Sequence, residues 1–210
     1  MKSYPDSRRT FPATLRNKKP ILDVLQRVLP AEGSILETSS GSGEHAVYFA
    51  PAFAPRVFIT SEPDPDLRAS IAARCNQSTA VNLRMPLNLD VTKDLWPVEM
   101  NPRVQPPISA ILNCNMIHIA PWIACLGLLT GAGRILQAGG VLYLYGPFKQ
   151  LGVTFGTSNE AFDRSLREQN QEWGVRSLES VAEIAAKEGL VLREILPMPM
   201  GNHSIIFERQ

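Results

Sequence analysis

Cysteine and histidine are scarce in this chain of 210 residues, which contains three of each. The cysteines form no C-x-x-C pair and stand in apolar or helical surroundings, so they predict reduced core thiols in a cytoplasmic protein. The histidines are far apart in the sequence, which argues against a histidine-based metal centre. These residues are Cys75, Cys114, Cys125, His45, His118 and His203. We therefore expect neither a disulfide framework nor a metal site.

The chain also lacks an excess of charge of either sign. Lysine and arginine number 21 against 20 aspartates and glutamates, which gives a net charge of +1. No overall field therefore attracts nucleic acid or an anionic membrane, and charge disfavours both as partners. The local exception is a basic N-terminal segment at residues 1–19. An organelle transit peptide is the alternative for it, but Pro5 and Pro12 interrupt the amphipathic helix that such a peptide needs.

Long apolar runs are missing as well. The sequence has no stretch of about 18 apolar residues and no signal-peptide core, so we expect no membrane insertion and no secretion. With 44% hydrophobic residues the chain can nevertheless bury a full core, and its length suits a single domain over residues 1–210.

Segments with helical and strand-like spacing alternate along the chain, which is typical of the α/β class. The predicted helices cover residues 20–29, 45–53, 64–76, 121–136 and 178–189, with Pro20 in the first turn of the first helix. The predicted strands cover 34–38, 56–61, 83–89, 108–113, 141–145, 191–196 and 203–208. Residues 97–107 read as a proline-rich linker. We expect a mostly parallel seven-stranded sheet with helices on both faces.

The final two strands differ from the others in their connection. Only "PMPMGN" lies between them, which is too short for the helical crossover that parallel neighbours require. They are therefore predicted to form an antiparallel hairpin.

A glycine turn between the first strand and the next helix is the clearest ligand signal. Residues 41–46, "GSGEHA", satisfy the G-x-G-x-x-G/A pattern of dinucleotide sites, and Glu62 follows Gly41 at about the 20-residue distance of the ribose-binding acid. Taken alone, this indicates NAD. A turn that only lets helix and strand pack is the structural alternative.

Charge around the turn favours a different cofactor. Glu37 and Glu44 bracket Gly41 and Gly43, and two acids disfavour a pyrophosphate at a helix N-terminus. S-adenosylmethionine carries a sulfonium and an ammonium and no phosphate, so these acids suit it better. The sequence thus favours S-adenosylmethionine.

Acids also follow the second and third predicted strands. Glu62 can accept hydrogen bonds from both ribose hydroxyls, and Asp90 can accept one from the adenine amino group. Each alone is more typical of a solvated loop acid or a helix cap, and Asp64 before Pro65 suits a plain N-cap. Their recurrence at the carboxyl ends of successive strands is what indicates a site.

Several motifs resemble a known superfamily and one family within it. Glu37-Thr-Ser-Ser-Gly41-Ser-Gly43 is similar to the class I methyltransferase motif, with Ser39 in place of its first glycine. "LNLDVT" and "AGRILQAGGVLYLYGPF" resemble further segments of that superfamily. "RNKKPIL", "LETSSGSGEHAVYFA", "NMIHIAPW", "SNEAFDRSLR", "NQEWGVRS" and "MPMGNHSIIF" together resemble the methyltransferase-like protein 26 family, also called domain of unknown function 938.

The resemblance implies a Rossmann-like class I methyltransferase fold that uses S-adenosylmethionine. In the family's arrangement Arg16 and Asn17 precede the first helix and fold over the cofactor, with Arg16 paired to its carboxylate. A solvated basic stretch is the plainer interpretation of the neighbouring Lys18 and Lys19. The substrate does not follow from the resemblance.

Four residues near the ends of the fourth and fifth strands are candidates for chemistry. His118 or Tyr145 would take the proton of a hydroxyl acceptor, whereas an amine or thiolate needs no base. Asn113 and Asn115 would accept from an amino nucleophile or hold the methionine part of the cofactor. Alternatively, His118 is a loop histidine bonded to backbone, and each asparagine caps a helix.

Residues 148–177 form a long segment without clear periodicity. Segments of this length in a compact domain are usually functional or disordered, and aromatic side chains argue against disorder. We expect a lid and wall of the acceptor pocket, in which Phe155, Phe162 and Trp173 either contact the substrate or anchor the segment to the core.

These observations together predict an S-adenosylmethionine-dependent methyltransferase that acts on a small-molecule acceptor. A protein or peptide acceptor is the second choice. A regulatory module that binds S-adenosylmethionine without methyl transfer and an NAD-dependent oxidoreductase are the alternatives from other classes. The sequence does not predict an oligomeric state.

Overall fold

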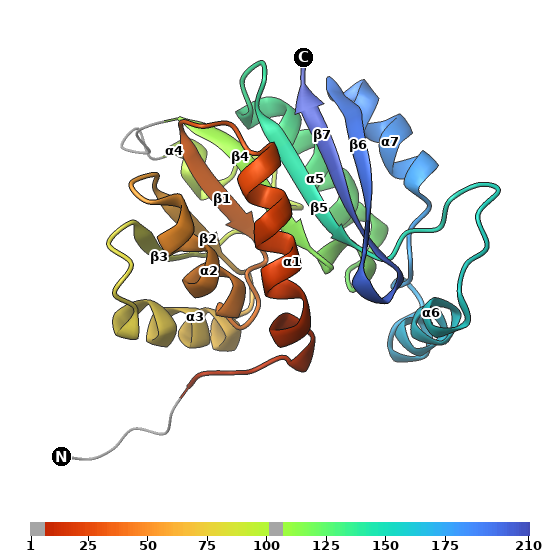
Figure 1. Ribbon diagram of the computed structural model, residues 1–210, viewed down its shortest axis with the longest axis horizontal. Coiled ribbons are helices and arrows are strands. Elements are labelled where there is room, and N and C mark those ends of the chain that lie inside the picture. The colour runs from red at the N-terminus through yellow and green to blue at the C-terminus, as the bar shows by residue number, and fades with distance from the viewer. Residues whose placement is uncertain (1–6, 101–106) are drawn as a thin grey trace.

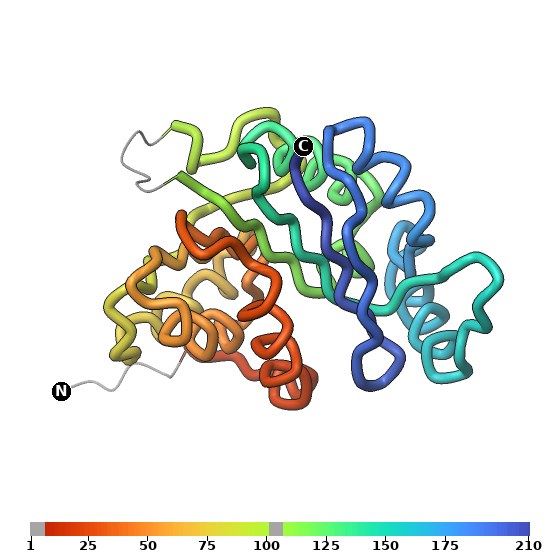
Figure 2. The backbone as a smooth tube through the Cα atoms, turned by 45° about the horizontal axis from the view of Figure 1, so that its top comes forward, coloured from red at the N-terminus to blue at the C-terminus, as the bar shows by residue number. Residues whose placement is uncertain are grey.

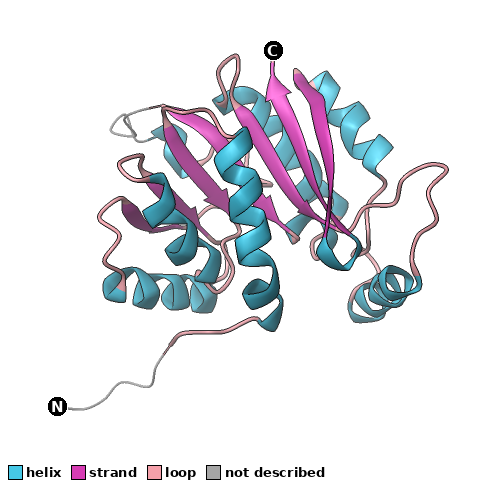
Figure 3. Cartoon of the chain, in the orientation of Figure 1, coloured by secondary structure: helices cyan, strands magenta, loops and turns pink. Residues whose placement is uncertain are grey.

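The computed structural model describes residues 7–100 and 107–210 and contains a seven-stranded sheet in the order β3-β2-β1-β4-β5-β7-β6 (Figures 1 and 3). The strands are β1 Ser34–Thr38, β2 Phe58–Ser61, β3 Leu83–Leu87, β4 Ile108–Cys114, β5 Val141–Gly146, β6 Leu190–Met198 and β7 Asn202–Arg209. The first five pair in parallel, and β7 pairs antiparallel with both β5 and β6. The predicted α/β class and the terminal hairpin are confirmed.

Helices cover both faces of the sheet, and residues along each strand alternate between two cores. Leu36 and Ile111 pack into the core under α5 and α7, whereas Ile35 and Leu112 pack into the core under α1 and α2. The helices are α1 Pro12–Val28, α2 Glu44–Phe49, α3 Pro65–Gln77, α4 Pro97–Met100, α5 Trp122–Ile135, α6 Thr157–Gln169 and α7 Leu178–Lys187, with short 3₁₀ turns η1 Ala50–Phe53, η2 Met116–His118 and η3 Pro199–Gly201. Within the described part of the chain, no helix has the length and apolar character needed to cross a membrane.

The parallel strands bring their carboxyl ends to one edge of the sheet. The register pairs Thr38 with Asn113 and Cys114 with Tyr145, so the ends of β1, β4 and β5 are neighbours. The start of α1 and helix α6 lie at this same edge (Figures 1 and 2). Open α/β sheets bind ligands at this edge.

Two predicted elements differ from the structure. Helix α1 starts at Pro12, so Pro20 lies inside the helix and not in its first turn, and Arg16 and Asn17 belong to the helix and do not precede it. The segment predicted as irregular between 148 and 177 contains α6, a polar helix in which only Leu166 is buried. The start of α1 was missed because Pro20 suits a first helical turn, and α6 was missed because only one of its residues is buried. In the predicted linker, α4 takes the first residues, and positions 101–106 lie outside the described part.

Candidate functional site

The turn after β1 has three residues in the left-handed region at every second position. Ser39, Gly41 and Gly43 have φ values of +51°, +56° and +82°. A Cβ on Gly43 would lie 3.0 Å from the Cα of Ile71 in α3, so only glycine fits there without a shift. Ser39 occupies the position where the class I methyltransferase motif has its first glycine. Its backbone keeps the left-handed conformation that glycine favours.

Glu37 at the end of β1 is a buried carboxyl group with one unpartnered oxygen. Its exposed fraction is 2%, and no described residue donates a hydrogen bond to its Oε2 atom. Burial raises the pKa of Glu37 to about 7, Ser40 acts against this rise, and the charge of Glu62 adds to it. A buried acid of this kind is ready to receive a positively charged group.

Glu62 reaches back to the glycine turn from the end of β2. Its Oε2 accepts a hydrogen bond from the Gly41 amide at 3.0 Å, and its Oε1 accepts one from the Asp64 amide at 3.2 Å. Burial raises the pKa of Glu62, while these two bonds lower it. Each carboxylate oxygen keeps a lone pair for a further donor. Asp64 itself caps α3, as predicted.

The Asp90 side chain makes its contacts within its own turn. Its Oδ1 accepts from the amide and the hydroxyl of Thr92 at 2.9 and 2.8 Å, and its Oδ2 lies 4.0 Å from Lys93. Among the described residues, no hydrogen bond or ion pair joins it to Glu37 or Glu62. Its contact with an adenine remains a prediction.

The two asparagines after β4 are placed by the backbone. Asn113 donates from Nδ2 to the Thr38 hydroxyl at 3.0 Å, and its buried Oδ1 has no partner among the described residues. Asn115 has a φ of +65°, and its amide donates to the Tyr145 carbonyl at 2.8 Å. Neither side chain caps a helix. Asn113 thus offers a second unpartnered acceptor at the same edge as Glu37.

Helix α1 brings Arg16 and Asn17 to Tyr145. Burial raises the pKa of Tyr145 to about 12, and the nearby Cys114 adds to the rise, whereas Asn17 and the charge of Arg16 lower it. Asn17 is buried, and its Oδ1 accepts from His45 Nε2 at 2.8 Å. Arg16 is exposed and has no hydrogen bond or ion pair within residues 7–100 and 107–210. Tyr145 therefore keeps its proton at neutral pH, which does not support its predicted role as a base.

His118 is fully buried beneath the chain that leaves β5. Its Nδ1 accepts from the Arg176 amide at 3.4 Å, so the ring proton is on Nε2, which has no partner in the described structure. Burial lowers the pKa of His118 to about 3. Its basic lone pair faces an amide donor, so the predicted role as general base does not fit this geometry. The alternative interpretation, a loop histidine bonded to backbone, describes it better.

The charge of Glu44, which was expected to disfavour a phosphate at the turn, is partly balanced by its neighbours. Its carboxylate accepts from the Phe11 amide and the Ser42 hydroxyl, both at 2.8 Å, and lies 3.9 Å from Arg74. Its charge is thus partly balanced, and the charge argument rests on Glu37. The sequence carries no signal for the contacts of Phe11 and Arg74, which come from distant segments.

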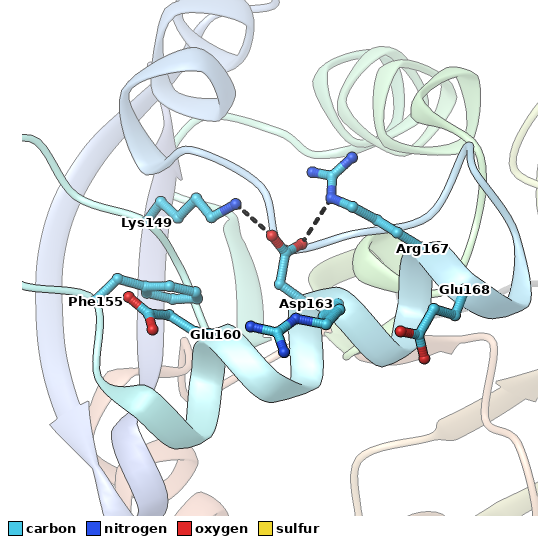
Figure 4. Close-up of a pocket in the computed structure, with 7 residues that line it drawn as sticks. Lys149, Phe155, Glu160, Asp163, Arg167 and Glu168 are labelled. Atoms are coloured by element: carbon cyan, nitrogen blue, oxygen red, sulfur yellow. Dashed lines mark hydrogen bonds and ion pairs between the residues drawn. The ribbon is translucent and has the colours of Figure 1, made fainter.

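A cavity of about 660 Å³ lies between the chain after β5 and one face of α6 (Figure 4). Asp163 is at its centre, 2.6 Å from Lys149 Nζ and 3.3 Å from Arg167 Nε, and the Lys149 ammonium lies 5.4 Å from the centre of the Phe155 ring. Glu160, Arg164 and Glu168 complete the lining. Within the described ranges, no cluster of three or more acidic, histidine or cysteine side chains is arranged to hold a metal ion.

The fold is similar to those of several solved structures. It matches mitomycin 7-O-methyltransferase with a TM-score of 0.75 at 13% identity, covering 94% of this chain and 54% of that one. An O-methyltransferase family 2 protein from Planctomyces limnophilus, in complex with apigenin, matches with a TM-score of 0.70 at 20% identity and coverages of 93% and 61%. Human N-acetylserotonin methyltransferase, in complex with S-adenosylmethionine, matches with 0.68 at 13% identity and coverages of 93% and 55%.

The chain thus spans little more than half the length of these structures, and at such identities the likeness concerns the fold. It has the Rossmann-like fold of class I methyltransferases, as the resemblance implied. A family model described as "Protein of unknown function (DUF938)" matches residues 8–209. Because that match covers almost the whole sequence, the chain belongs to the DUF938 family.

Proposed function

We propose that this chain is an S-adenosylmethionine-dependent methyltransferase that acts on a small-molecule acceptor. The observation that carries the proposal is the buried Oε2 of Glu37, which has no partner in the described structure and stands beside a turn of three left-handed residues. A buried carboxylate without a counter-charge is costly, and a cationic ligand at this position offsets that cost.

The polar groups at the edge of the sheet fit this cofactor. Glu37 would receive its ammonium group, Glu62 its ribose hydroxyls, and the exposed Arg16 its carboxylate. Asn113 Oδ1 and the second carboxylate oxygen of Asp90 would supply the remaining acceptors, the latter for the adenine amino group. The similarity in fold to methyltransferases, one of which has S-adenosylmethionine bound, supports the same assignment.

The bound cofactor would supply an electrophilic methyl group, and the chain's own residues would orient the acceptor and exclude water. Tyr145 keeps its phenolic proton at neutral pH, and His118 is a neutral ring whose Nδ1 lone pair already accepts from the Arg176 amide, so in this proposal neither residue removes a proton. This favours an acceptor that reaches its nucleophilic form without a protein base, such as an amine, a thiol or an acidic phenol.

The cavity against α6 is the proposed acceptor site, and residues 148–177 are its lid. Its volume lies within the range of small-molecule sites. It combines one aromatic ring, Phe155, with charged groups of both signs. Hydrogen bonds lead from Asp163 toward the strand ends, because Asp163 accepts from the Val175 amide at 2.7 Å and the next amide, of Arg176, donates to His118 at 3.4 Å.

Calorimetric titration with S-adenosylmethionine and S-adenosylhomocysteine tests the proposal, with NADH as the control ligand. We expect micromolar affinity, about −8 kcal/mol, weakened in Glu37→Gln and in Glu62→Ala. The matched control is Glu183→Gln, since Glu183 is an exposed acid on α7 paired with Lys187. Absence of binding by both adenosyl ligands, or equal affinity in Glu37→Gln and wild type, would contradict the assignment.

A non-catalytic module that binds the cofactor is the second candidate, favoured by the lack of a general base among the described residues at the strand ends. Incubation with S-adenosylmethionine and a panel of phenols, thiols and amines separates the two. Formation of S-adenosylhomocysteine above the acceptor-free rate supports a methyltransferase, whereas binding without turnover on any acceptor supports the module.

A further inference from the structure

Residues Ser7–Phe11, here called the strap, run along α3 before they enter α1 (Figures 1 and 2). The Arg9 amide donates to the Ser70 hydroxyl at 2.8 Å, and the Arg74 guanidinium donates to the Arg9 carbonyl and, at 3.2 Å, to the Thr10 hydroxyl. Arg8 adds a 2.7 Å bond to Gln77 at the end of α3. Specific hydrogen bonds therefore hold the strap against α3.

The side chains that hold the strap also hold the glycine turn. Ser70 Oγ and Arg74 Nε both donate to the Ser42 carbonyl, at 2.9 and 3.0 Å. Glu44 accepts from the Phe11 amide and the Ser42 hydroxyl with the same carboxylate oxygen. Ser70, Arg74 and Glu44 thus join the strap and the turn into one hydrogen-bonded unit. Movement of the strap therefore disturbs side chains that also hold the turn, and movement of the turn disturbs those that hold the strap.

Phe11 is the strap residue that reaches the turn itself. A Cβ on Gly41 would lie 3.4 Å from the Phe11 ring, so the ring rests on the Gly41 backbone. The Gly41 amide in turn donates a hydrogen bond to Glu62. The Phe11 side chain is nevertheless 44% exposed, which leaves part of an aromatic surface open beside the turn.

We propose that Phe11 is a wall of the ligand site, and that the strap is fixed when the ligand binds. This inference rests on the proposed function, because the ligand it invokes is the adenosyl cofactor. A ligand that lies along Gly41 and Glu62 contacts the open part of the Phe11 ring and buries it. Because such coupling is reciprocal, a ligand that stabilises the strap on α3 should bind less tightly when the Phe11 side chain is replaced by alanine.

The test combines affinity with limited proteolysis. A protease binds its substrate as a detached, extended segment, so we expect release of the strap from α3 to speed cleavage by trypsin after Arg8 and Arg9. The intact mass of the product identifies the cut. We expect saturating S-adenosylhomocysteine to slow these cuts about tenfold in the wild type and to have little effect in Phe11→Ala, which also binds the ligand about tenfold more weakly. Trypsin activity on an added peptide must be unchanged by the ligand.

Val191→Ala is the matched control, because Val191 is 47% exposed and lies on the edge strand β6, which three strands separate from β1 and its glycine turn. It should bind S-adenosylhomocysteine with wild-type affinity. If the wild type binds the ligand but Phe11→Ala binds equally well and the ligand does not slow the cuts, the strap inference is wrong and the cofactor assignment stands. If the wild type does not bind at all, the cofactor assignment fails.

Discussion

Replacement of Glu37 by glutamine should stabilise the ligand-free protein in alkaline solution while weakening its ligand binding. In the folded chain the pKa of Glu37 is raised from 4.5 to about 7 by burial. The folded state therefore holds this proton more tightly than the unfolded state does. Its stabilising effect is complete below pH 4.5 and is lost as the pH rises through 7.

The size of this effect follows from the shift. A difference of about 2.5 pKa units at 1.36 kcal/mol each gives about 3.4 kcal/mol of stability lost above pH 7. Glutamine has nearly the shape of the protonated acid and does not ionise. We therefore expect Glu37→Gln to exceed the wild type by about 3 kcal/mol at pH 8, and by about 1 kcal/mol or less at pH 5.

Urea denaturation of both proteins at pH 5, 6, 7 and 8 measures this difference, with equal m-values as the condition for comparison. Glu183→Gln is again the control, because its exposed carboxyl should give a small difference with a different pH dependence. A free energy of unfolding that is equal in Glu37→Gln and wild type at pH 8 would refute the reasoning that Glu37 is an uncompensated buried charge.

Three further predictions concern the turn and the histidine. Ser39→Gly should raise the free energy of unfolding by about 1 kcal/mol, because Ser39 has a φ of +51°; a decrease in urea denaturation would contradict this. Gly43→Ala should lower it by about 1–3 kcal/mol, more than Gly139→Ala, which has a similar φ of +80° but no atom within 4 Å of the added Cβ; equal losses would exclude the clash with α3. His118 should remain a neutral ring with its proton on Nε2 from pH 5 to 8, since its pKa is lowered to about 3; a ¹⁵N titration that shows protonation near pH 6.5 would disprove the burial argument.

The sheet could be predicted from the sequence because its signals are local. The apolar run at 108–113 indicated a strand buried on both faces of a parallel sheet. The short "PMPMGN" connection allowed only an antiparallel hairpin. Helix α6 could not be predicted in this way, since its residues are mostly polar and only Leu166 is buried, which leaves too few apolar positions for a clear helical period. The start of α1 was hidden by Pro20, which usually marks a first turn.

For the candidate site, the residues could be placed at one edge of the sheet but their protonation could not. The acid at position 37 is visible in the sequence, whereas its pKa depends on burial by the whole fold. The state of His118 is set by Arg176, which is 58 positions away in the chain. The bond from the Gly41 amide to Glu62 likewise forms only after β1 and β2 are paired.

The two ends of the α6 segment are tied directly to each other. The Lys149 amide donates to the Arg176 carbonyl at 3.0 Å, and the Leu178 amide donates to the Lys149 carbonyl at 2.8 Å. The chain between these bonds leaves and returns at one point, and added loop length carries only a small entropic cost. Gln150, Asn159 and Gly174 contact His203, Gly201 and His118, so they belong to the frame that the sheet needs. The exposed positions 151–154 lack such bonds to the sheet in the described structure, and they are therefore the place to graft loops when engineering new selectivity.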